Sequence, residues 1–351
     1  MTSFYPGPSQ VYAKVPQWVQ MAYDEGMLSA NHRSPMFQDM VKEVYSLLRE
    51  KLNIPEDYDI VFTSSATECW EIIAQSFVTE KTYHLYNGAF GEKWYRYTKP
   101  LVPTVVGYQF DYRHPLDLDQ IIVPDDVEVL CLTQNETSNG TQISNATLRA
   151  IRTHYPDYLI AVDATSSMAG VALDFTTADI WYASVQKCFG LPAGMGIMIT
   201  SPSATERALE IQERDHYNSW AFMHENAKNF QTHYTPNVMG IYLLYQSLKE
   251  RDAIDKVDAK LRKRASNWIE FLEQLPQLNL LVESDEARSY TVLTLEGEPN
   301  VIKTLHKRAQ EAGYTMGKGY GDWKKTTLRI ANFPAIKKDA IVGLQQALMG
   351  Q

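Results

Sequence analysis

Two residues near the middle of the chain, Lys187 and Asp163, have the types and the setting that amine chemistry requires. Lys187 follows a strand expected over 179–184, and Asp163 ends a strand expected over 158–163. A lysine amine can form a Schiff base with an aldehyde, and a carboxylate can keep a pyridine nitrogen protonated. The ends of neighbouring strands would bring both groups to one edge of a sheet. The pair therefore predicts a pyridoxal 5′-phosphate (PLP) enzyme with Lys187 and Asp163 as catalytic residues.

Each of these residues also has an ordinary structural interpretation. An aspartate at a strand end often caps the following turn, and most lysines are solvated surface residues. A glycine-rich segment, Gly-Leu-Pro-Ala-Gly-Met-Gly at 190–196, follows Lys187 and would let the backbone pass close to a bound ring. The three features together favour the catalytic interpretation.

Three further clusters also fall just after expected strands. The segment 64–67, Ser-Ser-Ala-Thr, leads a helix whose first N–H groups and hydroxyls would suit a phosphate monoester. Phe90 could stack on an aromatic cofactor ring, and Thr137 could hydrogen-bond the hydroxyl of that ring. The alternatives are ordinary: hydroxyl residues cap most helices, an aromatic after a strand is most often core, and polar residues form turns.

The order of the elements predicts an α/β fold. A helical pattern over 37–52 is followed by short apolar segments that are mostly separated by further helical patterns. The expected strands are 59–63, 83–86, 127–133, 158–163, 179–184 and 196–200. Such alternation is typical of a largely parallel sheet that is covered by helices on both faces.

The pattern changes in the last third of the chain. Long helical patterns run from Pro236 to about Leu275, after which strands near 290–295 and 327–333 flank a helix near 300–312. This order is typical of a smaller α+β domain. We therefore expect a large domain over residues 12–250 and a small C-terminal domain over 251–351, which the N-terminal segment 1–11 joins.

The composition excludes several classes of protein. The formal net charge of −9 over 351 residues argues against binding a nucleic-acid backbone, and no segment nears the roughly 18 apolar residues of a membrane span. Three scattered cysteines, Cys69, Cys131 and Cys188, suit a reducing compartment better than a disulfide framework. The N-terminus has no signal-peptide pattern. We expect a cytoplasmic protein with no nucleic-acid partner, no membrane partner and no metal.

Several motifs together resemble one family, the class V, fold-type I PLP-dependent aminotransferases, over nearly the whole chain. The matching segments are Pro6-Gly7-Pro8, His32-Arg33-Ser34-Pro35, Asn87-Gly88-Ala89-Phe90-Gly91, Val162-Asp163-Ala164 and Gln186-Lys187. The resemblance implies a large domain with a mainly parallel, seven-stranded type of sheet. It also implies transamination between small-molecule amino and keto acids with PLP as cofactor.

The resemblance assigns roles residue by residue. Lys187 looks like the Schiff-base lysine, Asp163 like the partner of the pyridinium nitrogen and Phe90 like the stacking aromatic. Ala66, Thr67 and Gln186 fall where the family holds the cofactor phosphate, and Thr137 matches the cofactor-binding threonine of an Asn-Glu-Thr motif. Arg329 looks like the arginine that clamps the substrate α-carboxylate, a task that suits a guanidinium fork.

Family members are homodimers with shared active sites. Tyr234 and Thr235 align with a segment that the partner chain donates to each cofactor phosphate site. His32 and Arg33 are the candidates for binding the substrate, with donation across the dimer as one way to reach it. The resemblance therefore implies that a single chain holds an incomplete site.

Two subfamilies compete. Asn135-Glu136-Thr137, the His32-Arg33 pair and the segment 330–333 look most like phosphoserine aminotransferases, which act on 3-phosphohydroxypyruvate and glutamate. The segments 32–35 and 87–92 also look like alanine– or serine–glyoxylate aminotransferases. Phosphoserine aminotransferases usually carry Trp where Phe90 stands, Ser where Pro6 stands, and a His-Arg pair where residues 317–321 read Gly-Lys-Gly-Tyr-Gly. Lys318 is the candidate to replace that pair as a point charge.

Three other functions are weighed against transamination. A cysteine desulfurase has this fold but needs a nucleophilic cysteine late in the chain, and no cysteine follows Cys188. A nicotinamide oxidoreductase would carry Gly-x-Gly-x-x-Gly after the first strand, and none occurs there. A relative that has lost catalysis and serves as a binding partner is a non-enzymatic alternative. The presence of both Lys187 and Asp163 argues against it.

Overall fold

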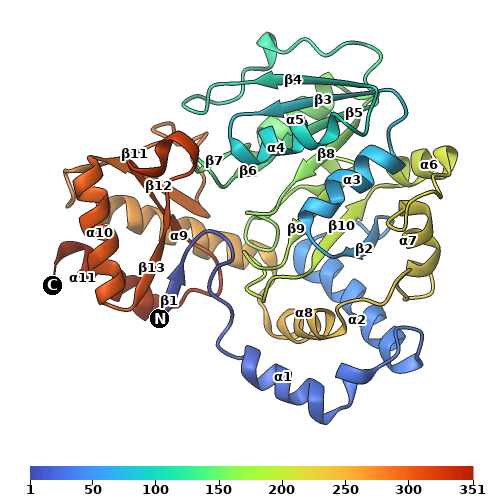
Figure 1. Cartoon of the computed structure of the whole chain (residues 1–351), viewed down its shortest axis with the longest axis horizontal. Coiled ribbons are helices and arrows are strands. Elements are labelled where there is room, and N and C mark those ends of the chain that lie inside the picture. Colours follow the sequence, from blue (N-terminus) through green and yellow to red (C-terminus); the bar gives the residue numbers. More distant parts are fainter. Residues whose placement is uncertain (351) are drawn as a thin grey trace.

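The computed structural model describes residues 1–350 and contains a large and a small β-sheet (Figure 1). It also contains a two-stranded ribbon formed by β6 Asn135–Glu136 and β7 Thr141–Gln142. The large sheet has seven strands in the order β2-β10-β9-β8-β5-β3-β4. Their bounds are β2 Asp59–Thr63, β3 Lys81–Tyr86, β4 Thr104–Gln109, β5 Val129–Thr133, β8 Leu159–Asp163, β9 Ile180–Ser184 and β10 Gly196–Thr200. Strand β10 is antiparallel to both of its neighbours, and the other pairs are parallel.

The central strands are apolar along their whole length because both faces of the large sheet are covered. In β8, Ile160 and Val162 pack into one hydrophobic cluster, whereas Ala161 between them packs into a second cluster. Successive side chains of a strand point to opposite faces, so the two clusters lie on opposite sides of the sheet. This arrangement explains why the strand reads as a continuous apolar run rather than an alternating one.

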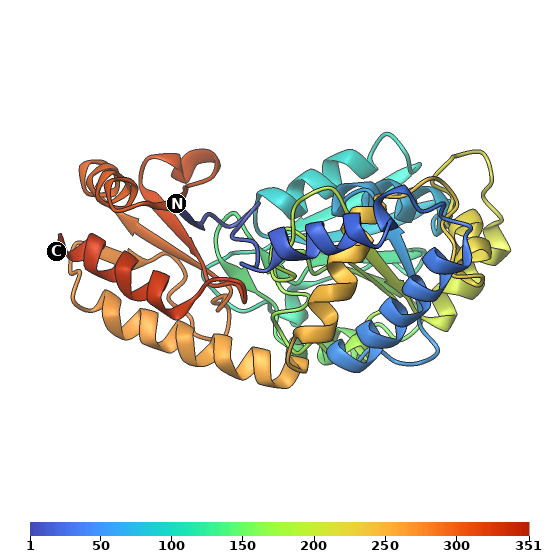
Figure 2. The ribbon, with the colours of Figure 1, turned by 90° about the horizontal axis from the view of Figure 1, so that it is seen from below.

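Helices cover the two faces and connect the strands (Figures 1 and 2). Those of the large sheet are α1 Val15–Asp24, α2 Pro35–Leu52, α3 Ala66–Ser76, α4 Ala89–Thr98, α5 Asn145–His154, α6 Pro202–Ile211, α7 Trp220–Ala227 and α8 Val238–Glu250, with the 3-10 turns η1 Met27–Ser29, η2 Leu118–Gln120 and η3 Phe175–Thr177. A serine hydroxyl caps four of them, because Ser34, Ser65, Ser144 and Ser201 each accept a hydrogen bond from a first-turn backbone N–H.

The small sheet joins the two ends of the chain. Its order is β1-β13-β14-β12-β11, with β1 Thr2–Phe4, β11 Leu278–Leu280, β12 Val292–Gly297, β13 Tyr314–Lys318 and β14 Thr327–Ala331. The helices α9 Ile254–Leu272, α10 Pro299–Glu311 and α11 Lys338–Met349 and the 3-10 turn η4 Gly321–Lys324 accompany it. Figure 2 shows α9 running along this part of the molecule from the large sheet, and Figure 1 places both termini beside the small sheet.

Each predicted strand of the large sheet is confirmed within two residues, as is the α/β class with a mainly parallel sheet. The structure adds six strands that the sequence pattern did not predict: β1, β4, β6, β7, β11 and β13. Strand β4 lies at the sheet edge and has no buried residue. Its sequence therefore carries no continuous apolar run from which the strand could be predicted. Strand β1 pairs in parallel with β13, more than 300 residues away. The domain boundary at 250/251 stays a prediction.

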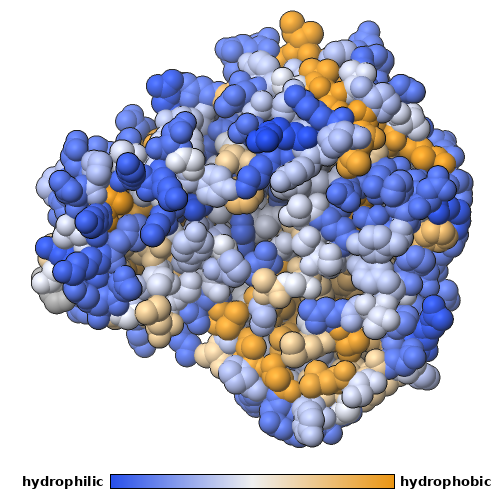
Figure 3. All heavy atoms as spheres, in the orientation of Figure 1, coloured by the Kyte–Doolittle hydropathy of each residue, from blue (hydrophilic) through white to orange (hydrophobic). Residues whose placement is uncertain are grey.

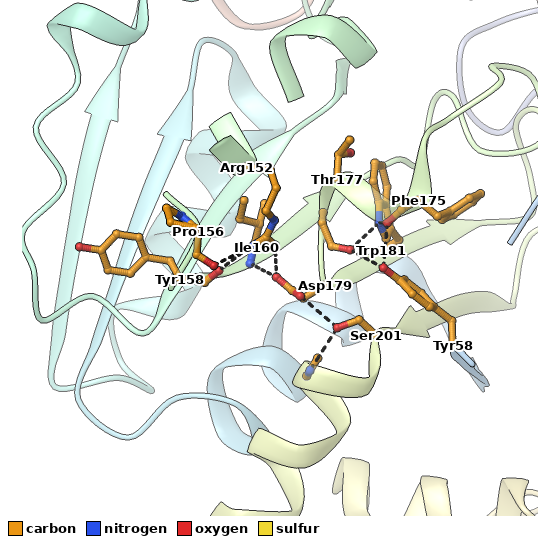
Figure 4. Close-up of polar contacts among 12 residues, drawn as sticks. Tyr58, Arg152, Pro156, Tyr158, Ile160, Phe175, Thr177, Asp179, Trp181 and Ser201 are labelled. Carbon is orange, nitrogen blue, oxygen red and sulfur yellow. Dashed lines mark hydrogen bonds and ion pairs between the residues drawn. The ribbon is translucent and has the colours of Figure 1, made fainter. Parts of the chain in front are cut away.

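A polar network stabilises the edge of the large sheet at which β8 and β9 begin (Figure 4). This edge is opposite the carboxyl ends of the two strands. The Asp179 carboxylate accepts hydrogen bonds from the Ile160 N–H at 2.8 Å and the Ser201 hydroxyl at 3.0 Å, and it pairs with Arg152. The same aspartate therefore joins β8, the start of β9 and the cap of α6. These contacts hold the strands in register far from the ends that carry Asp163 and Lys187.

Two further features concern residues 1–350 as a whole. No helix in this range has the length and apolar character needed to span a lipid bilayer. The three cysteines are buried and carry free thiols.

Candidate active site

Lys187 lies at the base of a pocket at the carboxyl ends of β8 and β9. Its side chain is buried, and its ammonium group donates hydrogen bonds to the hydroxyls of Thr137 and Ser166, each at 2.8 Å. Burial lowers the pKa of Lys187 from 10.5 to about 8, while the charges of Asp163 and Glu136 act in the opposite direction. About a tenth of this amine is therefore neutral, and hence nucleophilic, at pH 7, far more than for a lysine with an ordinary pKa.

Asp163 ends β8 and lines the same pocket. One carboxylate oxygen accepts a hydrogen bond from the Thr165 N–H at 2.8 Å. Burial raises the pKa of Asp163, whereas the hydrogen bond from the Thr165 N–H and the charge of Lys187 oppose that rise. A cation placed against this carboxylate would favour its charged form. The geometry thus suits both interpretations of Asp163, as a turn cap and as the partner of a protonated ring nitrogen.

The N-terminus of α3 forms one wall of the pocket. Ala66 and Thr67 line it, and the Ala66 N–H donates to the Ser184 hydroxyl at 2.9 Å. Thr67 is exposed. The first-turn N–H groups and the positive end of the helix dipole favour an anion at this wall. Gln186, which lines the same pocket, is the neighbour of Lys187 in the chain.

Phe90 lies at the start of α4, and its ring centroid is 5.4 Å from the Lys187 nitrogen. The buried Glu136 carboxylate holds this turn, because it accepts hydrogen bonds from the N–H groups of Phe90 at 3.1 Å and Gly91 at 3.0 Å. Thr137, the next residue, receives the bond from Lys187. The Asn-Glu-Thr segment therefore supports both the aromatic ring and the lysine.

Arg329 projects from β14 of the small sheet into the pocket and is buried. Its guanidinium donates to the carbonyl oxygens of Lys318 at 2.9 Å and Thr137 at 2.8 Å. Burial lowers the pKa of Arg329, while Tyr5, Glu136 and Tyr320 oppose that effect. These bonds hold the side chain at the junction of the two sheets with one end toward the pocket.

The N-terminal segment forms a further wall of the pocket. Residues 5–8 line it, and the Ser9 N–H donates to the Gln186 carbonyl at 3.0 Å. Gly7 has a φ of +146°, and a Cβ atom there would lie 2.7 Å from Cε of Lys187. Only glycine allows the backbone to pass this close to the lysine.

Four pocket-lining residues carry a buried side-chain oxygen that has no hydrogen-bond partner among residues 1–350. They are Thr133, Asn135, Thr165 and Gln186. Leaving such a group without a partner costs about 1–3 kcal/mol, and polar groups of a bound cofactor and substrate would supply the missing partners. The pocket therefore fits PLP: an amine, a carboxylate, an aromatic ring and an anion-binding helix terminus surround one space.

The comparison with known proteins agrees with this constellation. The aminotransferase class-V family model matches residues 3–309. The chain belongs to the class-V aminotransferase family. It is a PLP-dependent enzyme that transfers amino groups.

Several relatives of this aminotransferase are similar along their whole length. The phosphoserine aminotransferase of Rhodococcus opacus is 26% identical over 355 residues, which cover 97% of this chain and 92% of the relative. The solved structure of a phosphoserine aminotransferase from Cytophaga hutchinsonii is 32% identical and superposes with a TM-score of 0.94, covering 100% of this chain and 98% of that one. The pyridoxamine–pyruvate aminotransferase of Mesorhizobium loti, at 20% identity and a TM-score of 0.85, shares the fold.

The structure brings eight of the predicted site residues of the aminotransferase into one pocket. They are Ala66, Thr67, Phe90, Thr137, Asp163, Gln186, Lys187 and Arg329. It does not bring the other four there: His32 and the exposed Arg33 lie in the turn before α2, and Tyr234 and the exposed Thr235 lie before α8. Their roles stay predictions. Lys318 is exposed and does not line the pocket.

The sequence analysis did not single out three residues that the pocket contains or contacts. Ser166 binds Lys187, whereas Tyr5 and Tyr320 line the opening near Arg329. For Ser166 a signal existed, since it lies three residues after Asp163 in the loop that follows β8. Tyr5 and Tyr320 come from the N-terminal segment and the small sheet, and no local pattern connects them with Lys187.

Proposed function

We propose that this aminotransferase transfers the amino group of L-glutamate to 3-phosphohydroxypyruvate, giving O-phospho-L-serine and 2-oxoglutarate in serine biosynthesis. The observation that carries the proposal is the likeness, over the whole chain, to a solved phosphoserine aminotransferase that is 32% identical. The curated relatives of the same name support it. The alanine– or serine–glyoxylate alternative is less supported: a solved alanine–glyoxylate aminotransferase from Nostoc is 20% identical, with a TM-score of 0.82.

The site residues have distinct tasks in this proposal. Bound PLP supplies an aldehyde that accepts the amino group and a ring that withdraws electrons. Lys187 attaches the cofactor and then moves a proton at the substrate α-carbon. Asp163 would keep a positive charge on the ring nitrogen, and Phe90 would stack on the ring. Ala66, Thr67 and Gln186 would hold the phosphate, Thr137 would hold the ring hydroxyl, and Arg329 would bind the substrate α-carboxylate.

We also propose that the enzyme is a cytoplasmic homodimer that shares its active sites. The four predicted residues outside the pocket lie near exposed apolar side chains: Leu28 and Met36 flank His32 and Arg33, and Met239 follows Thr235 closely in the chain. Helix α8 packs against both α2 and η1, so these segments are neighbours. Figure 3 displays apolar side chains on the lower part of this face, where Figure 1 has α8 and α2. Clustered apolar exposure favours a protein interface.

Sedimentation of the purified enzyme at micromolar concentration should give the mass of two chains of 40.0 kDa. Disrupting the apolar surface with Met239→Glu should shift the population toward monomer and lower the affinity for the cofactor, because each site would lose Tyr234 and Thr235 of its partner. The matched control is Met349→Glu, since Met349 is exposed to a similar degree but lies near the C-terminus, in α11. A monomer with full activity would refute the shared site.

Replacing Arg33 with alanine tests the substrate assignment. A phosphorylated keto acid brings two anionic groups, and each needs cationic or N–H partners in a partly desolvated pocket. We expect Arg33→Ala to raise the activation free energy that kcat/KM reports. The increase should be roughly 2 to 4 kcal/mol larger for 3-phosphohydroxypyruvate than for hydroxypyruvate, which lacks the phosphate. Steady-state kinetics with the two acceptors at fixed glutamate measure this difference.

Two results of the Arg33 experiment would count against the proposal. One is a wild-type preference for glyoxylate, which carries no second anionic group. The other is an equal loss with both acceptors, because a phosphate contact must act on the phosphorylated substrate alone. Arg33→Lys serves as the matched control: it keeps the charge but not the bidentate geometry, so it should recover part of the loss.

A further inference from the structure

A lysine that contacts two residues of the pocket wall, Phe90 and Tyr320, takes no part in the proposed chemistry. Lys93 lies in α4 beside the large sheet, whereas Tyr320 follows β13 of the small sheet and lines the pocket. The Lys93 ammonium donates a hydrogen bond to the Tyr320 hydroxyl. A second contact also joins the two parts of the molecule. The ring of Trp323 in η4 packs edge to face against that of Tyr112, which follows β4, with 5.1 Å between the ring centroids. Lys93 thus links α4, beside the large sheet, to a residue of the pocket wall that follows β13 of the small sheet.

Lys93 is close to the groups that would surround the substrate. Its nitrogen lies 5.4 Å from the ring centroid of Phe90 and 5.0 Å from that of Tyr320. The same two rings also lie near the reaction groups: Lys187 Nζ is 5.4 Å from the Phe90 centroid, and Arg329 Cζ is 5.7 Å from the Tyr320 centroid. Lys93 therefore contacts one ring that Lys187 also contacts and one that Arg329 also contacts.

The charge of Lys93 is not neutralised within the described chain. Other lysines pair with a carboxylate, as Lys81 does with Asp126, but no carboxylate of residues 1–350 lies within 4 Å of the Lys93 nitrogen. The side chain is half-buried, and its partners are a neutral hydroxyl and two ring faces. An ammonium group in such a setting has lost part of its hydration and attracts an anion more strongly than a fully exposed one would.

We propose that Lys93 binds the second anionic group of the substrate, namely the γ-carboxylate of the amino donor and the phosphate of the keto acid. This inference rests on the proposed function, in which both substrates carry such a group. With the α-carboxylate at Arg329, the rest of the substrate extends past Tyr320 toward Lys93, and the ammonium exchanges the Tyr320 hydroxyl for the anion. A lysine suits this task because its flexible stem allows one charge to meet two anions of different length.

The test compares substrates with and without the second anion. For Lys93→Met, the ratio of kcat/KM with glutamate to kcat/KM with alanine should fall about 10- to 100-fold, and so should the ratio of 3-phosphohydroxypyruvate to hydroxypyruvate. Lys93→Arg should restore part of both ratios. The matched control is Lys99→Met: Lys99 also lies over a tyrosine ring, but that ring belongs to Tyr95, which, unlike Tyr320, does not line the pocket. Its ratios should match those of the wild type.

The outcomes separate this inference from the proposed function. If the wild type prefers 3-phosphohydroxypyruvate but Lys93→Met lowers all four substrates equally, Lys93 does not bind the second anion and the proposed function stands. If the wild type rejects 3-phosphohydroxypyruvate, the proposed function fails, and the glutamate-to-alanine ratio still tests Lys93. Tyr320→Phe distinguishes binding from positioning, because it removes only the hydroxyl. A loss in that variant as large as in Lys93→Met would mean that Lys93 acts by holding Tyr320, and the inference would be wrong.

Discussion

Lys187→Ala is expected to abolish transamination, with kcat lowered roughly 10,000-fold or more, which is the upper range for removing a positioned acid–base group. The variant should still bind PLP, because the helix terminus at Ala66 and Thr67, the Phe90 ring and Asp163 remain. It should lack the visible absorbance of the lysine-linked cofactor, and borohydride should no longer fix the cofactor to the protein. Absorbance spectra and single-turnover kinetics measure both effects.

Two controls make the Lys187 experiment specific. Small primary amines added to Lys187→Ala should restore part of the turnover, since they can carry the missing proton. Ser166→Ala, which removes one of the two hydroxyl partners of Lys187, should bind the cofactor covalently and reduce turnover much less. Normal activity in Lys187→Ala would overturn the catalytic assignment.

The lowered pKa of Lys187 gives a pH dependence for loading the apoenzyme with cofactor. The neutral amine is the reactive form, and burial lowers its pKa to about 8. The rate of covalent attachment should therefore rise about tenfold per pH unit below pH 8 and level off above it. A rate that continues to rise to pH 10 would indicate a lysine with an ordinary pKa. Stopped-flow absorbance across pH 6 to 10 distinguishes the two.

Asp163→Asn is expected to fold normally but to slow the proton-transfer half-reaction roughly 1,000-fold, because a ring nitrogen without an anionic partner loses its proton and withdraws electrons poorly. Asparagine has the same shape and keeps an oxygen to accept the Thr165 N–H. It therefore separates charge from capping. Single-turnover rates with glutamate measure the effect, and thermal unfolding checks the fold.

The same pair of variants tests the structural interpretation of Asp163. If the residue were only a turn cap, Asp163→Asn would behave like the wild type, while Asp163→Ala would lose stability or cofactor affinity at unchanged single-turnover rates. If the charge matters, both variants should be slow. Asp163 is buried, and burial raises its pKa. The positive ring nitrogen of the bound cofactor should reverse this shift, so the holoenzyme should keep a charged Asp163 at neutral pH.

The sequence by itself determined the chemistry of the site and the class of the fold. Lys187 and Asp163 could be recognised because of their places beside continuous apolar strands: Asp163 ends one, and Lys187 closely follows another. The carboxyl ends of parallel strands meet at one edge of the sheet. The central strands were predictable for the same reason: both faces are buried, so the apolar pattern is local and strong. The hydroxyl residues at 64–67 indicated the helix terminus that is proposed to hold the cofactor phosphate.

Tertiary structure alone decided which distant segments complete the pocket. Strand β1 pairs with β13, Gly7 passes over Lys187, and Tyr320 meets Lys93, although each pair is far apart in sequence. Edge strand β4 and the short strands of the small sheet have weak apolar patterns, so their pairing depends on long-range packing rather than on local periodicity. No local sequence pattern indicates a role for Lys93 or Tyr320. Their proposed roles depend on the charge and the aromatic rings that the fold places beside them.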